Sequence, residues 1–342
     1  MQKVRIPTPV IGFDPPVYVC KRANKPFYLD GSLDKEFWKE ASFTEEFQSI
    51  TGDEMEKPAF STKVKMLWDE EYFYFGAQME GEEIWATLEE KDSKIFLDNA
   101  FEILIDPDSD THDYFEFEVN AKNTIWDLFL TKPYRDNGRA LSSFDIKGTK
   151  SAVKIEGELN KPGDGNKRWT VEVAMPFSVL KECAAGGRTP VCGDFWRVNF
   201  VRVHWWTKVV NGQYQKEERP EQHWVWAPTG VVNIHYPELW GVVFFADGEE
   251  TFSLPSYEYE KWELRKIYYK LHEYYDKYGF FPKETSNRVE EIFSSKHIKI
   301  ESTTHNFELS CISEDGTYEV SMLGDGKTSV KKADKERALH QK

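Results

Sequence analysis

The chain has 342 residues, 40% hydrophobic and 30% charged, a balance typical of a globular protein of about two domains. Lys and Arg total 44 against 59 Asp and Glu, and the formal charge of -15 argues against nucleic-acid partners and anionic membrane surfaces. No run of eighteen apolar residues is present, so we expect no membrane-spanning segment.

The opening residues, "MQKVRIPTPV", contain no long apolar stretch, so they do not predict an intact signal peptide and leave the location open. The first regular element that we expect is a short helix over residues 32–41, "SLDKEFWKEA". Ser32 is expected to cap this helix. Its apolar side consists of Leu33, Phe37 and Trp38.

From about residue 62 to residue 245 the pattern is mostly that of strands, because apolar and polar residues alternate between turns rich in Gly, Pro, Asp and Asn. The expected strands lie within residues 62–69, 72–79, 100–107, 114–120, 151–159, 168–176, 195–206 and 239–246. One short helix begins in "MPFSVLKECA" at residues 175–184. This arrangement predicts a mainly β fold, with an antiparallel β-sandwich over residues 1–247.

The composition changes at "ADGEETFSLPS", residues 246–256. The segment 257–282 is amphipathic at helical period, and Gly279 and Pro282 are expected to end the helix. Three short strand candidates follow, within residues 297–302, 306–312 and 317–323. We therefore expect a small C-terminal α+β appendage over residues 255–335, whose role the sequence does not indicate.

Four cysteines do not force a disulfide framework in a chain of this length. Cys183 and Cys192 flank the loop "AAGGRTPV" and could pair, but free cysteines are more often isolated buried thiols. No CxxC motif or Cys/His cluster indicates zinc. The absence of GxSxG, Walker, GxGxxG and HExxH motifs argues against acyl transfer by a serine nucleophile, nucleotide binding and zinc proteolysis.

The segment "DPDSDTHD" resembles half of a calcium loop, and Asp106, Asp108 and Asp110 are its candidate ligands. The sixth position is Thr111 instead of Gly and the twelfth is Phe117 instead of Glu, so the EF-hand pattern fails. Asp and Pro favour turns, and a surface turn is the more common interpretation. We expect no required cofactor and leave calcium open.

Strand candidate 114–120 combines an apolar face with a polar one. Phe115, Phe117 and Val119 are expected to enter the core, because side chains alternate along a strand. The opposite face carries Glu116, Glu118 and Asn120, and we expect it to face a groove. The following segment is expected to bring Trp126 and Asp127 to the rim.

Aromatic residues make up 15% of the chain, including 12 Trp. Tryptophans near strand ends are expected to be more exposed than those at strand centres, and a flat ring surrounded by carboxylates, amides and guanidinium groups suits a sugar. The candidate groups are Glu118, Asn120, Asn123, Trp126, Asp127, Arg135, Arg202, Trp205, Trp206, Trp224 and Trp226. The alternative for each tryptophan is an ordinary core position.

The order of the segments "FYLDGSLDKEFWKEA", "DNAFEILIDPDSDTHDYFEFEVNAKNTIWDLFL", "KPYRDNG", "RWTVEVAMPF" and "HWVWAPTG…HYPELWGVVFF" resembles the family 9 carbohydrate-binding modules, over about residues 26–245. The resemblance is greatest to stand-alone family 9-like proteins of polysaccharide-degrading bacteria. It implies a β-sandwich that binds plant or host glycans such as xylan or cellulose fragments, often beside a glycoside hydrolase and sometimes with structural calcium.

The resemblance also implies positions for a sugar site. The family's acidic strand residue matches Glu102, and its first stacking tryptophan falls near Phe96. Its arginine falls at Glu118, and its second tryptophan falls between Trp226 and His235. The resemblance favours a secreted, periplasmic or cell-surface location.

The function that these observations favour is non-catalytic binding of an oligosaccharide or polysaccharide. The alternative is a glycoside hydrolase or related enzyme that uses a carboxylate pair, for which Glu102, Glu116, Glu118 and Asp127 are available.

Overall fold

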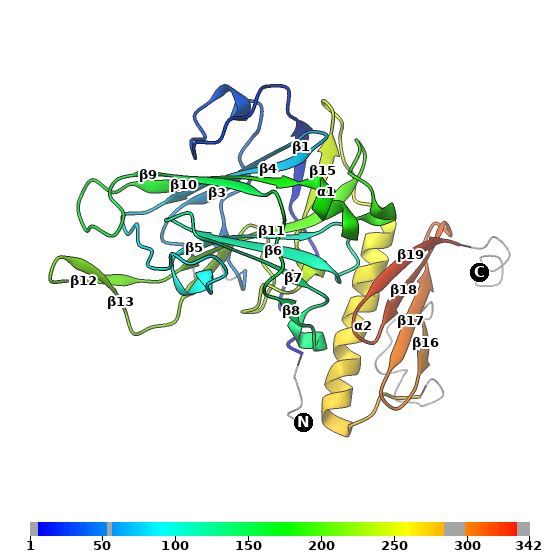
Figure 1. Cartoon of the computed structure of the whole chain (residues 1–342). Helices are drawn as coiled ribbons and strands as arrows, with labels where there is room; N and C mark the ends of the chain where they lie inside the picture. Colours follow the sequence, from blue (N-terminus) through cyan, green and yellow to red (C-terminus); the bar gives the residue numbers. More distant parts are fainter. Residues whose placement is uncertain (1–5, 53–56, 284–297, 334–342) are drawn as a thin grey trace.

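The computed structural model describes residues 6–52, 57–283 and 298–333 (Figure 1). The strands of the main body are β1 (Val17–Arg22), β2 (Gln48–Ser49), β3 (Thr62–Trp68), β4 (Tyr72–Glu80), β5 (Ala100–Asp106), β6 (Tyr114–Asn120), β7 (Ile125–Leu130), β8 (Ala140–Leu141), β9 (Lys150–Glu156), β10 (Arg168–Pro176), β11 (Phe195–His204), β12 (Thr207–Val210), β13 (Gln213–Lys216), β14 (Gln222–Val225) and β15 (Gly241–Ala246). Its short helices are η1 (Glu36–Trp38), η2 (Ile95–Leu97), η3 (Tyr134–Asp136), α1 (Phe177–Leu180), η4 (Lys181–Cys183), η5 (Ala185–Gly187) and η6 (Pro237–Leu239).

One curled sheet forms both layers of the predicted sandwich. Its strands follow the order β8-β7-β6-β5-β11-β15-β1-β3-β4-β10-β9. Figure 1 shows β9, β10, β4 and β3 in one layer and β5, β6 and β7 in the other. The mainly β fold is thus confirmed. The pairing differs from a fully antiparallel sandwich at one strand, because β1 runs parallel to both of its neighbours, β15 and β3.

The main core lies between the two layers and is rich in aromatic rings. As predicted for β6, Phe115, Phe117 and Val119 point into it and are at most 1% exposed. Phe101 and Phe200 stack there at 5.8 Å between ring centroids. Much of the high aromatic content of the chain is therefore structural.

The expected helix at residues 32–41 is reduced to the single turn η1. Ser32 does not cap this turn, because its backbone N–H donates to Asp30 while Lys35 occupies the position before η1. The apolar side is nevertheless formed as expected, since Phe37 and Trp38 are buried. The four cysteines are free, including Cys183 and Cys192.

Beyond β15, a long helix packs with a four-stranded sheet (Figure 1). The helix is α2 (Ser256–Tyr278), and the strands are β16 (Lys299–Ser302), β17 (Phe307–Ile312), β18 (Tyr318–Leu323) and β19 (Thr328–Lys332). Gly279 ends the helix as predicted, with φ +80° and its N–H bonded to the carbonyl of Tyr275. Strand β19 was not anticipated. Residues 284–297 and 334–335 of the predicted unit lie outside the described residues.

Helix α2 is joined to the sandwich through apolar and charged contacts. Tyr236 and Leu239 of the sandwich share a core with Leu264 and Tyr268 of the helix. Division into two independent domains at residues 247 and 255 stays a prediction, and this shared core indicates that the two parts stabilise each other.

We expect the buried ion pair between Arg197 and Glu258 to be the strongest single link between sandwich and helix, because both side chains are at most 3% exposed. Glu258→Gln should lower the free energy of unfolding by about 3–5 kcal/mol, since it leaves the guanidinium charge uncompensated. Glu263→Gln is the control, because its pair with Lys266 is half exposed and should change stability by less than about 1 kcal/mol. Equal losses in chemical denaturation would contradict this assignment.

Candidate functional site

A row of carboxyl groups lies on the outer face of β5 and β6. Glu102 pairs with Glu118 across the two strands, and Glu116 pairs with Leu104 one position further along the same face. Because side chains alternate, the phenylalanines that fill the core force these three glutamates onto the opposite face. They are not solvated there, since Glu102, Glu116 and Glu118 are only 4%, 5% and 2% exposed.

Aromatic rings surround the three glutamates. Trp126 on β7 lies opposite Glu118, and Phe96 of η2 approaches it with 6.1 Å between ring centroids. The backbone N–H of Phe96 donates to the Glu118 carboxylate at 2.8 Å. In the same region, the rings of Tyr134 and His235 meet edge to face, with 4.7 Å between their centroids.

These groups line one open cavity of about 400 Å³. Its remaining lining residues are Ile50, Leu128, Glu221, His223, Val232, Asn233 and Ile234. The cavity thus combines flat rings, aliphatic side chains and four carboxyl groups. This composition and size match those of small-ligand sites.

Burial makes the three glutamates hold their protons more tightly than usual. It raises the pKa of Glu116 to about 8. The pKa of Glu102 is raised well above its ordinary value by burial and then by the charge of Glu116. The pKa of Glu118 is raised by burial and by both neighbouring glutamates, against the effect of the Phe96 N–H. No lysine or arginine stands among the described residues that line the cavity.

The wall formed by Tyr134 and His235 is supported from behind by helix α2. Arg135 donates to the His235 carbonyl at 3.3 Å and to Glu238 at 2.9 Å, and it covers the ring of Tyr236 at 3.9 Å. The hydroxyl groups of Tyr268 and Tyr269, both on α2, donate to Asp136 and Glu238 respectively. The C-terminal unit therefore helps to position one side of the cavity.

Part of the sandwich matches a known protein family. Residues 29–190 match the family model described as "Carbohydrate family 9 binding domain-like". Over these residues, the match confirms the resemblance predicted from the sequence. No curated protein matches the chain.

Three solved structures are similar to this chain at low sequence identity. A Bacteroides uniformis ATCC 8492 protein described as a candidate carbohydrate-binding protein has a TM-score of 0.51 and 13% identity, over 68% of this chain and all of that one. A family 9 module from Caldicellulosiruptor kristjanssonii, solved with cellotriose, gives a TM-score of 0.44 and 13% identity over 70% of this chain and 98% of that one. A family 9 module from the same organism, solved with glucose, has a TM-score of 0.44 and 14% identity, over 69% of this chain and 98% of that one.

The sandwich brings five of the predicted site residues together in the cavity. They are Phe96, Glu102, Glu118, Trp126 and His235. Sequence reasoning did not name Tyr134, although it directly precedes Arg135 in "KPYRDNG", and it did not name Glu221, His223 or Asn233. Glu116 appeared as part of the polar strand face and as a candidate carboxylate, and its alternation with Glu118 is the signal that places it beside the site.

Three of the predicted site residues on or near β6 and β7 have other roles. Asn120 does not face the cavity, because its amide donates to Leu88 and Asp98 while its oxygen accepts the N–H groups of Lys122 and Thr124. Asn123 lies in an exposed turn with φ +60°. Asp127 is 1% exposed and accepts the N–H of Ile146, away from the cavity.

The predicted exposure of Trp224 and Trp226 is wrong, because each is 2% exposed and packed in the main core. Arg202 is also buried, and its guanidinium lies 5.0 Å from the Trp224 ring.

Trp205 and Trp206 are half-buried and are not among the residues that line the cavity. Trp205 donates to the Phe96 carbonyl and carries Lys216 at 3.4 Å above its ring, so it supports η2. Trp206 packs edge to face against His204 at 4.7 Å. Among the described residues, Trp126 is therefore the tryptophan that lines the cavity.

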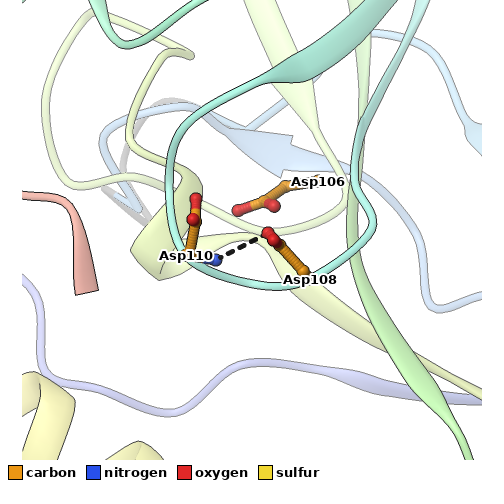
Figure 2. Close-up of side chains that lie close together, drawn as sticks. All are labelled: Asp106, Asp108 and Asp110. Atoms are coloured by element: carbon orange, nitrogen blue, oxygen red, sulfur yellow. Dashed lines mark hydrogen bonds between the residues drawn. The ribbon is translucent and has the colours of Figure 1, made fainter. Parts of the chain in front are cut away.

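A second acidic group lies in the turn after β5. Asp106, Asp108 and Asp110 place one carboxylate oxygen each within 4.8 Å of one another (Figure 2). Much of their hydrogen-bonding capacity serves the turn itself, since Asp106 accepts the N–H groups of Ser109 and Thr111. Lys327 of the C-terminal unit lies 3.1 Å from Asp110.

These residues offer the oxygen ligands that Ca²⁺ prefers, although an ammonium group already lies beside one of them. Burial and, to a smaller extent, the charge of Asp110 raise the pKa of Asp108 to about 6. A calcium site on this turn therefore stays a prediction that depends on displacing Lys327.

We expect stability to fall as the pH rises across the range in which the cavity glutamates ionise. A carboxyl group whose pKa is raised by folding contributes stability that is fully present below its ordinary pKa. This contribution is lost as the pH rises through the raised pKa, which is about 8 for Glu116. Glu116→Gln cannot ionise, so its melting temperature should fall less between about pH 5 and about pH 8. The exposed Glu45→Gln is the control. Identical pH profiles for the native protein and Glu116→Gln would contradict the raised pKa of this carboxyl group.

If the aspartate turn binds calcium, adding Ca²⁺ should raise the melting temperature, because a ligand that binds only the folded state stabilises it. At a hundredfold excess over the dissociation constant the gain is about 2.7 kcal/mol. Asp106→Asn should remove this gain, whereas Asp164→Asn, in a different loop, should keep it. An unchanged melting temperature with Ca²⁺ would show that Lys327 and the backbone satisfy the turn.

Proposed function

We propose that the protein binds an oligosaccharide in the cavity lined by Glu102, Glu116, Glu118, Phe96 and Trp126, without cleaving it. The main observation behind this proposal is that flat rings and buried carboxyl groups line one cavity. A sugar ring has an apolar C–H face that packs on an aromatic ring and a hydroxyl rim that needs polar partners. The match of residues 29–190 to the carbohydrate family 9 binding domain-like model supports the same conclusion.

In this proposal the protein acts in the degradation of plant or host polysaccharides, beside glycoside hydrolases and outside the cytoplasm. Cellulose and xylan fragments are the first ligands to test. Within the described part of the chain, no helix has both the length and the apolar character needed to cross a bilayer. The protein needs no cofactor for this role, because ring stacking and hydrogen bonds suffice.

A glycoside hydrolase is the second candidate, favoured by the three carboxyl groups in one cavity. Such an enzyme pairs a protonated acid with an ionised nucleophile or base. Glu116, with its pKa raised to about 8, suits the acid. The pKa values of Glu102 and Glu118 are raised as well, and no cationic side chain lines the described cavity to hold either of them ionised. We therefore favour binding, and release of sugar from the bound ligand would identify the enzyme.

Trp126→Ala and Trp226→Ala should separate the cavity from the core. Trp126 is half-buried at the cavity, so Trp126→Ala should remove most ligand binding at little cost in stability. Trp226 is 2% exposed, so Trp226→Ala should cost about 3–5 kcal/mol of stability. Calorimetry on native protein should give dissociation constants between about 1 μM and about 1 mM. Denaturation of the same samples supplies the stability measurement.

Two results would count against the proposal. One is the absence of binding to cellulose, xylan, pectin and host-glycan oligosaccharides at protein concentrations suited to millimolar affinity. The other is unchanged binding in a folded Trp126→Ala protein, which would place the sugar elsewhere.

A further inference from the structure

The proposed sugar cavity is rich in acidic side chains. Glu102, Glu116, Glu118 and Glu221 line it, and no lysine or arginine does so among the described residues. The larger cavity between the sandwich and the C-terminal unit, about 560 Å³, is different. There Asp108, Asp110, Asp194 and Glu258 are accompanied by Arg188 and Lys261.

The nearest guanidinium behind the cavity wall is already occupied. Arg135 is 5% exposed and is bound to Glu238, Asp136 and the His235 carbonyl. It therefore does not neutralise the three glutamates. His235 cannot do so either, because burial lowers its pKa to about 3. For Glu102 and Glu116, the described residues supply no hydrogen bond or ion pair to the carboxyl group.

We propose that the cavity selects a sugar with a free ammonium group, a 2-amino-2-deoxy sugar, over its neutral counterpart; this rests on the proposed function. An ammonium group among three carboxyl groups forms charge-assisted hydrogen bonds, which are about twice as strong as neutral ones. The faces of Trp126, Phe96 and Tyr134 are partial negative surfaces that also attract a cation.

The same selection disfavours sugars that carry carboxylate groups. An anionic uronide would add a negative charge to a cavity that holds four acidic groups, in a chain of formal charge -15. An N-acetylated sugar keeps the ring but loses the charge. The free amine is thus the feature that matches the cavity.

Binding of an ammonium sugar has a proton signature. The cation favours ionised carboxyl groups, and Glu116, with a pKa of about 8, is largely protonated at neutral pH in the free protein. At a pH at which the sugar amine is already protonated, binding should therefore release protons to the buffer. The other titratable groups facing Glu116 across the cavity are Glu102, Glu118, Tyr134, Glu221, His223 and His235. A neutral sugar should release few protons.

The experiment is calorimetry with three ligands of equal length: oligosaccharides of β-1,4-linked glucosamine, glucose and N-acetylglucosamine. On native protein we expect the glucosamine oligomer to bind about tenfold more tightly than the other two, the effect of one charge-assisted contact. Two buffers with different heats of ionisation measure the proton release.

Glu116→Gln is the diagnostic variant, because glutamine keeps the shape of the protonated carboxyl group. It should weaken binding of the glucosamine oligomer about tenfold more than it weakens binding of the glucose oligomer. Glu102→Gln repeats the test if Glu116→Gln does not fold. Exposed Glu45→Gln changes the net charge equally and should change neither affinity.

The outcomes separate this inference from the proposed function. Tight binding of the glucose oligomer, equal to that of the glucosamine oligomer and lost in Trp126→Ala, would overturn the ammonium selection and keep the sugar site. Binding of spermidine as tight as that of the glucosamine oligomer would overturn the sugar part and show recognition of charge alone. Failure of all three sugars to bind would overturn the ammonium selection, and it would overturn the proposed function as well if xylan, pectin and host-glycan oligosaccharides also fail to bind.

Discussion

Burial of three carboxyl groups side by side is the constraint on which the character of the site depends. The strand period places Phe115 and Phe117 in the core, so Glu116 and Glu118 must occupy the opposite face. Unpaired ionised carboxylates are costly away from water, and these groups respond by raising their pKa values. A ligand that supplies polar or charged partners to these carboxyl groups therefore gains binding free energy in the cavity.

The cavity also depends on the C-terminal helix α2. Residues 134–136 form one short turn with two faces: Tyr134 lines the cavity, whereas Arg135 and Asp136 bond with partners that reach α2. The His235 carbonyl is held by the same guanidinium. A unit for which the sequence indicated no role thus sits directly behind the proposed sugar site, so its loss should affect the shape of the cavity as well as stability.

The sequence predicts the strands well, because alternation and turn residues are local signals, as in β3, β4 and β6. It predicts part of the site through alternation and family resemblance, which together indicate Glu102, Glu118 and Phe96. It fails where contacts with residues distant in the sequence determine whether a side chain is buried. The pattern around Trp224 and Trp226 shows that the two share a face, yet only the pairing of β14 with β11 shows that this face is the core.

Tyr134 illustrates the remaining limit. It belongs to a loop, and its place at the cavity depends on Arg135 meeting Glu238, which lies more than a hundred positions later in the chain. No local pattern encodes such a contact. The parallel pairing of β1 has the same cause, since its partner β15 comes from the far end of the sandwich.

A crystal structure of the complex with a bound oligosaccharide tests the central claim most directly. We expect a sugar ring against Trp126, with hydroxyl or ammonium groups within hydrogen-bonding distance of Glu102, Glu116 and Glu118. A sugar bound on another surface, such as the larger cavity beside Asp108 and Lys261, with the glutamate cavity still empty, would contradict the account.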